Sequence, residues 1–188
     1  MDRQQAWELL NEYTDNPSLI KHALAVEAAM RHYARIYGED EELWAVAGLI
    51  HDFDYQRWPE PPEHTARGAE ILRGRGASEE IVGAMLSHAE WNQGEYPLDS
   101  KLRRTLYAVD EMTGFIIASA LVRPTRLEGL EPKSVKKRMK DKAFARAVDR
   151  EALQRGAELL GISLDEHIAN CIAAISGIAK ELGLDKAQ

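Results

Sequence analysis

The 188-residue sequence contains a single cysteine and no apolar run as long as a membrane-spanning helix. Cys171 alone cannot form an internal disulfide, and it lies in an apolar helical pattern, so we expect a reducing compartment. A membrane span needs about 20 apolar residues, and the N-terminal Met1–Gln5 lacks the basic-then-apolar pattern of a secretion signal. These absences predict a soluble, cytoplasmic protein without a membrane partner.

Positive charge is scarce as well. The chain has 31 acidic against 24 basic side chains, for a net charge of −7, which argues against a general nucleic-acid-binding protein. We therefore expect no specific nucleic-acid partner, although local basic clusters could hold a small anion. The densest basic run covers residues 133–142. The sequence allows a homo-oligomer but does not decide the oligomeric state.

The chain also has no internal repeat, no low-complexity tract and no strand pattern that competes with helix. Asn16-Pro17 is a typical helix start, and Gly38 is a typical stop for the same helix. Ser78 and Ser163 are typical N-caps of two later helices. We predict an all-α protein, and its length fits one domain by the usual ~100–200 residues per domain. The predicted helices cover about residues 4–13, 17–37, 40–52, 64–74, 79–88, 100–121, 144–161 and 163–179, with loops at 55–63 and 92–97.

Histidine and aspartate recur along these predicted helices. The set consists of His22, His51, Asp52, His64, His88 and Asp110. His51-Asp52 stands where a helical apolar run meets a proline-rich loop, and Asp110 lies among apolar residues, where an inward carboxylate is costly unless a cation pairs with it. Imidazole combined with carboxylate suits Zn, Mn or Fe. We therefore predict a metal site built from helices; the alternatives are a surface His-Asp pair, an exposed Asp110, and His64 and His88 without metal contact.

The order of these residues resembles the HD-domain superfamily of metal-dependent phosphohydrolases over about residues 17–125. Segment 64–72, HTARGAEIL, resembles the one that follows the His-Asp pair in many members, and segment 88–97, HAEWNQGEYP, resembles a loop of the HD-GYP subgroup. Ser87 and Glu95 depart from that subgroup's tandem histidine and glycine, so cyclic-dinucleotide specificity does not follow. The resemblance implies a compact, single-domain HD-type helical bundle over 1–188, with a metal-binding core at about 17–125 and a C-terminal helical extension at about 126–188.

The resemblance also implies a ligand set. In families with this pattern two histidines and two aspartates hold one metal, and further histidines hold a second. The first set would be His22, His51, Asp52 and Asp110. The second would be His64 and His88, with Asp52 bridging. We expect two divalent ions, with Fe or Mn favoured and Zn, Co, Ni and Mg as alternatives.

The implied activity is hydrolysis of a phosphomonoester or nucleotide-type phosphate, a small phosphorylated substrate, by metal-activated hydroxide. Asp52 would act through the metals, and Asp54 and Glu90 are candidate proton carriers by their proximity in sequence. Basic residues after the helix of Asp110 could compensate the charge of the phosphate, with a solvated helix face as the alternative for each. The candidates are Arg123, Arg126, Lys133 and Lys137, together with Lys136 and Arg138 of the same basic run.

Two other functions share this pattern. HD-type mixed-valent di-iron oxygenases have the same order of ligands, but they cleave carbon bonds with dioxygen and require redox-active iron. A non-catalytic HD-type binding or regulatory domain is the other alternative, and the complete set of candidate ligands argues against it. The identity of the metal would separate the two enzyme classes.

Overall fold

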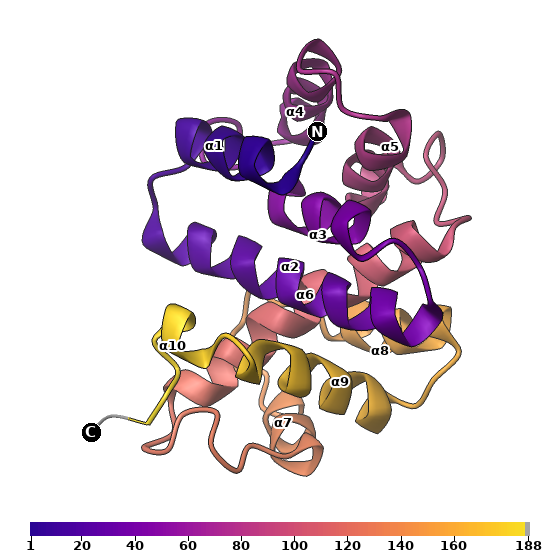
Figure 1. The fold of residues 1–188 in the computed structure, drawn as a ribbon. Helices are drawn as coiled ribbons and strands as arrows, with labels where there is room; N and C mark the ends of the chain where they lie inside the picture. The colour runs from indigo at the N-terminus through magenta and orange to yellow at the C-terminus, as the bar shows by residue number, and fades with distance from the viewer. Residues whose placement is uncertain (187–188) are drawn as a thin grey trace.

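The computed structural model describes residues 1–186, and within them the secondary structure is helical without any strand (Figure 1). This confirms the all-α prediction. The α-helices are α1 (Arg3–Tyr13), α2 (Pro17–Tyr37), α3 (Glu41–Ile50), α4 (Glu63–Gly74), α5 (Glu79–His88), α6 (Lys101–Leu121), α7 (Pro132–Met139), α8 (Arg150–Leu160), α9 (Leu164–Ser176) and α10 (Ala179–Leu182). A short 3-10 helix, η1 (Glu90–Asn92), follows α5.

Most of these helices begin where the sequence provides a polar N-cap. At seven of them the side chain of the capping residue accepts a hydrogen bond from a backbone N–H of the first turn, which typically contributes about 0.5–2 kcal/mol. The caps are Asp2, Asn16, Asp40, Ser78, Ser100, Asp149 and Ser163. Gly38 ends α2 in the left-handed conformation, with φ of 68°. The predictions made at Asn16, Gly38, Ser78 and Ser163 are therefore confirmed.

The predicted helix over 144–161 is wrong in its first part, because α8 begins only at Arg150. The guanidinium of Arg150 donates hydrogen bonds to the carbonyls of Ala145 and Val148 at 2.7 and 2.6 Å, and also to that of Phe144. Segment 141–148 therefore wraps around this side chain in turns, and the Asp149 side chain caps the helix that follows. The last predicted helix is also shorter than expected, since α9 ends at Ser176 and α10 is separate.

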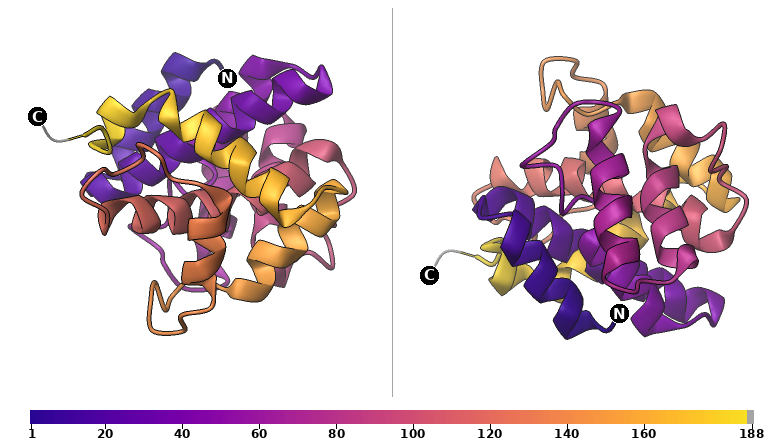
Figure 2. Two further views of the ribbon diagram at one scale, coloured as in Figure 1. Left: turned by 90° about the horizontal axis from the view of Figure 1, so that it is seen from below. Right: turned by 90° about the horizontal axis from the view of Figure 1, so that it is seen from above.

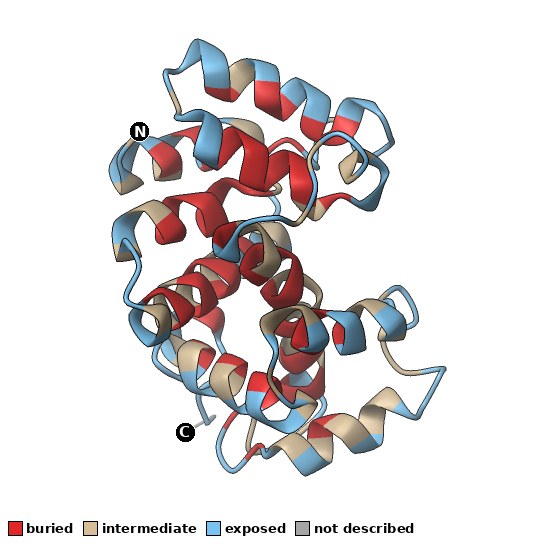
Figure 3. Cartoon of the chain, turned by 90° about the vertical axis from the view of Figure 1, so that its right-hand side faces the viewer, coloured by how far each residue is buried: buried red, intermediate tan, exposed pale blue. Residues whose placement is uncertain are grey.

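The helices lie on two sides of α2 (Figures 1 and 2). Helices α1, α3, α4 and α5 lie on one side, and α6 to α10 lie on the other. Each side has its own cluster of buried apolar side chains, and α2, α3 and α5 contribute to both clusters. Figure 3 shows the buried faces turned inward and the exposed faces outward. The fold thus has two adjoining cores with α2 between them.

Two glycines allow the close packing of helices that carry the site described below. A Cβ at Gly48 on α3 would lie 3.1 Å from the backbone nitrogen of Glu27 on α2. A Cβ at Gly156 on α8 would lie 2.9 Å from Cα of Ala108 on α6. Because side chains are absent at these two points, α3 approaches α2 closely and α8 approaches α6 closely.

No single helix in the described part of the chain combines the length and apolar character needed to cross a membrane. Taken together, α8 and α9 have the required length and apolar composition, but the two helices are bent by 95° relative to each other.

Candidate metal centre

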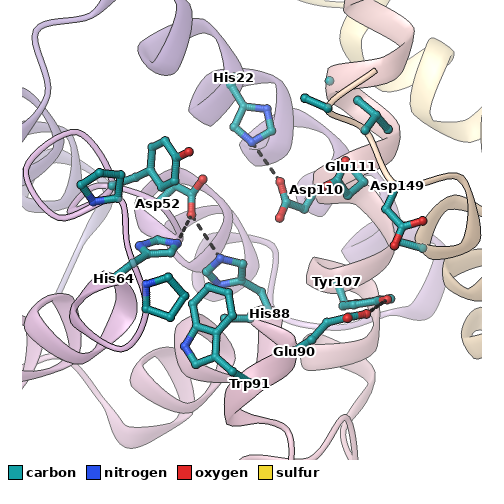
Figure 4. A pocket seen from close by; sticks show the side chains of 18 residues that line it. His22, Asp52, His64, His88, Glu90, Trp91, Tyr107, Asp110, Glu111 and Asp149 are labelled. Atoms are coloured by element: carbon teal, nitrogen blue, oxygen red, sulfur yellow. Dashed lines mark hydrogen bonds and ion pairs between the residues drawn. The ribbon is translucent and has the colours of Figure 1, made fainter. Parts of the chain in front are cut away.

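The structure brings all six predicted His and Asp residues to one place between the two cores, and Figure 4 shows five of them: His22, Asp52, His64, His88 and Asp110. Helix α2 provides His22, α5 ends at His88, and α6 provides Asp110 from its middle. His51-Asp52 follows the last turn of α3, and His64 lies at the start of α4. The elements that carry these side chains therefore span both sides of α2.

The first group of ligand atoms centres on Asp110. Its Oδ1 lies 2.9 Å from Nε2 of His22 and 3.4 Å from Nε2 of His51. The other carboxylate nearby is Asp52, whose Oδ2 lies 3.7 Å from Nε2 of His51. Ligand atoms of His22, His51 and Asp52 all lie within 4.8 Å of one another, which is close enough to hold one metal ion.

The second group uses the other oxygen of Asp52. Asp52 Oδ1 lies 3.2 Å from Nε2 of His64 and 3.1 Å from Nε2 of His88. These three residues also have ligand atoms within 4.8 Å of one another. Asp52 therefore belongs to both groups, with one carboxylate oxygen turned toward each.

Two of the imidazoles are fixed by backbone carbonyls. Nδ1 of His51 donates to the carbonyl of Gly48 at 2.8 Å, and Nδ1 of His88 donates to that of Met85 at 2.5 Å. A carbonyl can only accept, so Nδ1 carries the proton in each neutral ring and the lone pair is on Nε2. The nitrogen that faces the carboxylates is thus the one able to bind a metal.

His64 is fixed by a carboxylate instead. Its Nδ1 lies 3.0 Å from Oδ1 of the fully buried Asp54, whose Oδ2 accepts hydrogen bonds of 2.9 Å from the backbone N–H groups of Thr65 and Gly68. Asp54 does not line the cavity of the site. Its place behind His64 suits orientation of the imidazole and differs from the proton-carrying role expected from sequence proximity.

The backbone at this point has an unusual conformation. Thr65 has φ of 68°, in the left-handed region that a β-branched residue rarely adopts, and this kink interrupts the first turn of α4. The hydrogen bond from Thr65 N–H to Asp54 and one of 2.8 Å from the Asn92 side chain to Thr65 Oγ1 hold the conformation. Strain of this kind is found where a functional side chain must be positioned.

The electrostatics of the cluster favour a cation. Burial alone would lower the pKa of His51, but the charges of Asp52 and Asp110 outweigh it and raise the pKa to about 9. For the two carboxyl groups burial acts to raise the pKa, and the adjacent histidines overcome it, so that the pKa of both lies below the ordinary range. His51 Nε2 and Asp52 Oδ1 are buried without a hydrogen-bond partner. Since buried polar atoms rarely lack a partner, these two fit metal ligation.

The cluster opens into a cavity of about 620 Å³. Tyr55 and Trp91 lie at its margin, and both rings contact the ring of His64, with centroids 5.1 and 5.9 Å away. Three further carboxylates line the cavity: Glu90, Glu111 and Asp149. Among the described residues no lysine or arginine lines it, so a bound anion would depend on metal ions for charge compensation.

Two of these carboxylates differ in their surroundings. Glu90 accepts hydrogen bonds from the hydroxyl of Tyr107 at 2.8 Å and from Arg155 at 3.2 Å, so it is tied to α6 and α8. Glu111 was missed by sequence reasoning. Its burial, and then the charge of Asp110, raise its pKa to about 7. The signal available in the sequence was its position next to Asp110 on the same helix.

The predicted substrate-binding cations lie elsewhere. Arg123, Lys137 and Arg138 line a second cavity, which shares no lining residue with the first. Arg126 donates to the carbonyl of Leu121, and Lys136 pairs with Asp165. Lys133 lines neither cavity. None of these basic residues therefore lines the cavity of the metal centre, and α7 is instead paired with α9 through Lys136 and Asp165.

A family model described as HD domain matches residues 19–150. This span contains all six clustered His and Asp residues and most of the chain, so the protein belongs to the HD-domain family, whose members are mostly metal-dependent hydrolases. A comparison with solved structures gave no match.

Proposed function

We propose that this protein is a metal-dependent phosphohydrolase that acts on a phosphomonoester or nucleotide-type phosphate. The observation that carries the proposal is the position of Asp52, whose two carboxylate oxygens face two separate groups of histidines. A carboxylate shared in this way suits a pair of divalent ions, with Fe or Mn favoured. Ions bound there would supply a water of lowered pKa and charge compensation for phosphoryl oxygens.

The protein's own residues would hold and orient the reactants. His22, His51 and Asp110 would hold one ion with Asp52, and His64 and His88 the other. Asp54, behind His64, would keep that imidazole in its ligating orientation, as groups behind metal ligands commonly do. The cavity lies within the usual ~300–1,000 Å³ of small-molecule sites, which fits a small phosphorylated substrate.

Proton transfer to the leaving group needs a side chain that reaches the cavity. Glu90 and Glu111 both line it, whereas Asp54 is enclosed and has both oxygens engaged. Glu111 follows Asp110 on α6, and its side chain lines the same cavity as the proposed ligands (Figure 4). We assign the proton-carrying role to one of these two glutamates.

The experiment that tests the proposal is a hydrolysis assay on the intact protein. The protein would be stripped with a chelator, reloaded separately with Mn²⁺, Fe²⁺, Zn²⁺ or Mg²⁺, and assayed for phosphate release from p-nitrophenyl phosphate and nucleoside monophosphates with and without dioxygen. We expect release with at least one metal, no dependence on dioxygen, and loss of activity in Asp52→Asn. Asp99→Asn, an exposed carboxylate paired with Arg103, is the matched control and should keep full activity.

Two results would contradict the proposal. Turnover that requires both iron and dioxygen would assign the chain to the oxygenases of the family. Failure to bind any of the four metals, together with absence of hydrolysis, would indicate a non-catalytic domain.

A further inference from the structure

A second cavity, of about 560 Å³, lies between the loop that follows α6 and one face of α7. Its polar lining consists of Arg123, Thr125, Ser134, Lys137, Arg138 and Asp141. We propose that this cavity binds a small phosphate-bearing anion, either free phosphate or a phosphate monoester. The proposal does not depend on the function proposed above, because the two cavities have no residue in common.

The spacing along α7 explains how one helix supplies most of the lining. Ser134, Lys137, Arg138 and Asp141 follow one another at intervals of three, one and three residues, which places them on one face of a helix and its continuation. Lys136 falls on another face and pairs with Asp165 of α9. The two neighbouring lysines are thus separated, one neutralised by a carboxylate and one turned to the cavity.

The three cations of the cavity have no such partner. Within residues 1–186 no carboxylate oxygen lies within 4.0 Å of the charged nitrogens of Arg123, Lys137 or Arg138. Most other arginines of this acidic protein are paired, including Arg31 with Glu42 and Arg73 with Glu79. Among residues 1–186 Asp141 is the one carboxylate in the lining, so these side chains leave an excess of two positive charges.

Both guanidinium groups are held in place by contacts that leave their charge uncompensated. Nη2 of Arg123 donates to Thr125 Oγ1 at 3.0 Å and to the carbonyl of Glu128 at 2.7 Å. The guanidinium of Arg138 stacks on the ring of Phe144, with its carbon 5.1 Å from the ring centroid. Orientation before binding reduces the entropy lost when a ligand is bound.

The lining defines the chemistry of the ligand. Planar guanidinium groups match the oxygens of a phosphate, an ammonium adds charge, and the hydroxyl of Ser134 is a further donor. Within the described part of the chain no aromatic side chain lines the cavity, so it offers no stacking surface for a base. The end of α6 at Leu121 lies roughly 17 Å along the helix from Asp110 at 1.5 Å per residue. A phosphate here would therefore be separate from one at the metal centre.

Nuclear magnetic resonance of the intact ¹⁵N-labelled protein, loaded with diamagnetic Mg²⁺, tests the proposal. Inorganic phosphate and glycerol phosphate would each be titrated at constant ionic strength, with chloride as the reference anion. We expect saturable shifts at the amides of Thr125, Ser134 and Lys137 that chloride does not produce. Tighter binding of the ester would identify a phosphate monoester as the ligand, and equal or tighter binding of inorganic phosphate would identify the free ion.

Charge-removing variants distinguish specific binding in this cavity from a general effect of the protein's charge. Lys137→Gln and Lys137→Gln/Arg138→Gln should raise the dissociation constant, the double variant by roughly tenfold or more, since charge-assisted hydrogen bonds are lost. Lys136→Gln, which removes the same charge from the neighbouring position, should leave it unchanged within about twofold. The exposed Lys137 can be replaced without loss of packing. Absence of saturable shifts at up to roughly 50 mM of either anion, or equal weakening by Lys136→Gln, would overturn the proposal.

Discussion

Nδ1 of His64 lies 3.0 Å from Oδ1 of Asp54, and this hydrogen bond turns the other nitrogen of the imidazole toward Asp52. The carboxylate that directs the ring is itself fixed by two backbone N–H groups of α4. The orientation of His64 is therefore set by a residue that does not reach the cavity.

Replacing Asp54 with asparagine should weaken metal binding at the second group. One carboxylate oxygen would become an NH₂ group that faces a hydrogen-bond donor, so at least one hydrogen bond of Asp54 would be lost. Loss of a hydrogen bond that orients a metal ligand typically reduces metal affinity about 10–100-fold. Metal titration followed by elemental analysis would measure the change. The first group should keep its ion, and Asp99→Asn should match the unchanged protein; equal loss of both ions would contradict a role specific to His64.

Gly68 and Gly74 of α4 should respond differently to alanine. A Cβ at Gly68 would lie 2.8 Å from Oδ2 of Asp54 and would also meet the side chain of Met85, whereas one at Gly74 has nothing within 4 Å. We expect Gly68→Ala to lower the free energy of unfolding by about 1–3 kcal/mol and to lower metal occupancy. Gly74→Ala should leave the occupancy unchanged and raise the free energy of unfolding by up to about 1 kcal/mol, because alanine favours helical backbone over glycine. Urea denaturation with metal analysis tests both, and a neutral Gly68→Ala would show that Asp54 can shift without consequence.

His64 and His88 should behave as a unit. If both hold the second ion, His64→Ala and His88→Ala should each lower the metal content by about one equivalent and abolish most turnover, and the double variant should be little worse, because residues that act through one ion are not additive. His32, half-buried beside Asn170, supplies the control His32→Ala. Full activity and unchanged metal content in both single variants would leave a one-metal site on His22, His51, Asp52 and Asp110.

His167 should make the stability depend on pH. It is fully buried, its Nε2 donates to the carbonyl of Ala108 at 2.9 Å, and Nδ1 accepts from the hydroxyl of Tyr33 at 2.7 Å. Burial lowers its pKa from 6.5 to about 4, and the hydrogen bond to Ala108 opposes this only in part. Between these two pKa values the unfolded chain binds more protons than the folded one, so the free energy of unfolding falls as pH falls through this range and is fully retained above it.

The variant His167→Gln isolates this effect, since glutamine keeps a donor for Ala108 but does not titrate. Urea denaturation at pH 7 and pH 5 should show that the unchanged protein loses about 2 kcal/mol more than the variant over this interval. Equal losses in both proteins would mean that the pKa of His167 is the same in the folded and unfolded chains and would contradict the prediction.

The sequence predicted the helices well, because their caps are encoded locally, and the His and Asp residues that it singled out lie together in the fold. The caps at Asn16, Ser78 and Ser163 begin helices where predicted, and the recurring His and Asp residues occupy one cluster. The predicted division of 1–188 into a core and an extension, and the roles of individual residues, stay predictions.

What the sequence did not predict depends on contacts between distant segments. The turns of 141–148 form around the side chain of Arg150, which a helical pattern does not reveal. The place of Asp54 behind His64 follows from the left-handed conformation at Thr65, which nothing in the residue type suggests. The basic residues lie away from the metal centre because α7 docks on α9, a matter of tertiary packing.

The two apolar cores meet at the candidate metal centre. His64 is on α4, which belongs to one core, and Asp110 is on α6, which belongs to the other. Ions that share Asp52 would connect the two cores as a covalent cross-link does, and they would join segments that are far apart in sequence. The cooperativity of unfolding would then depend on bound metal. The protein would unfold as one unit with metal present, and the two cores would unfold partly independently once the metal is removed.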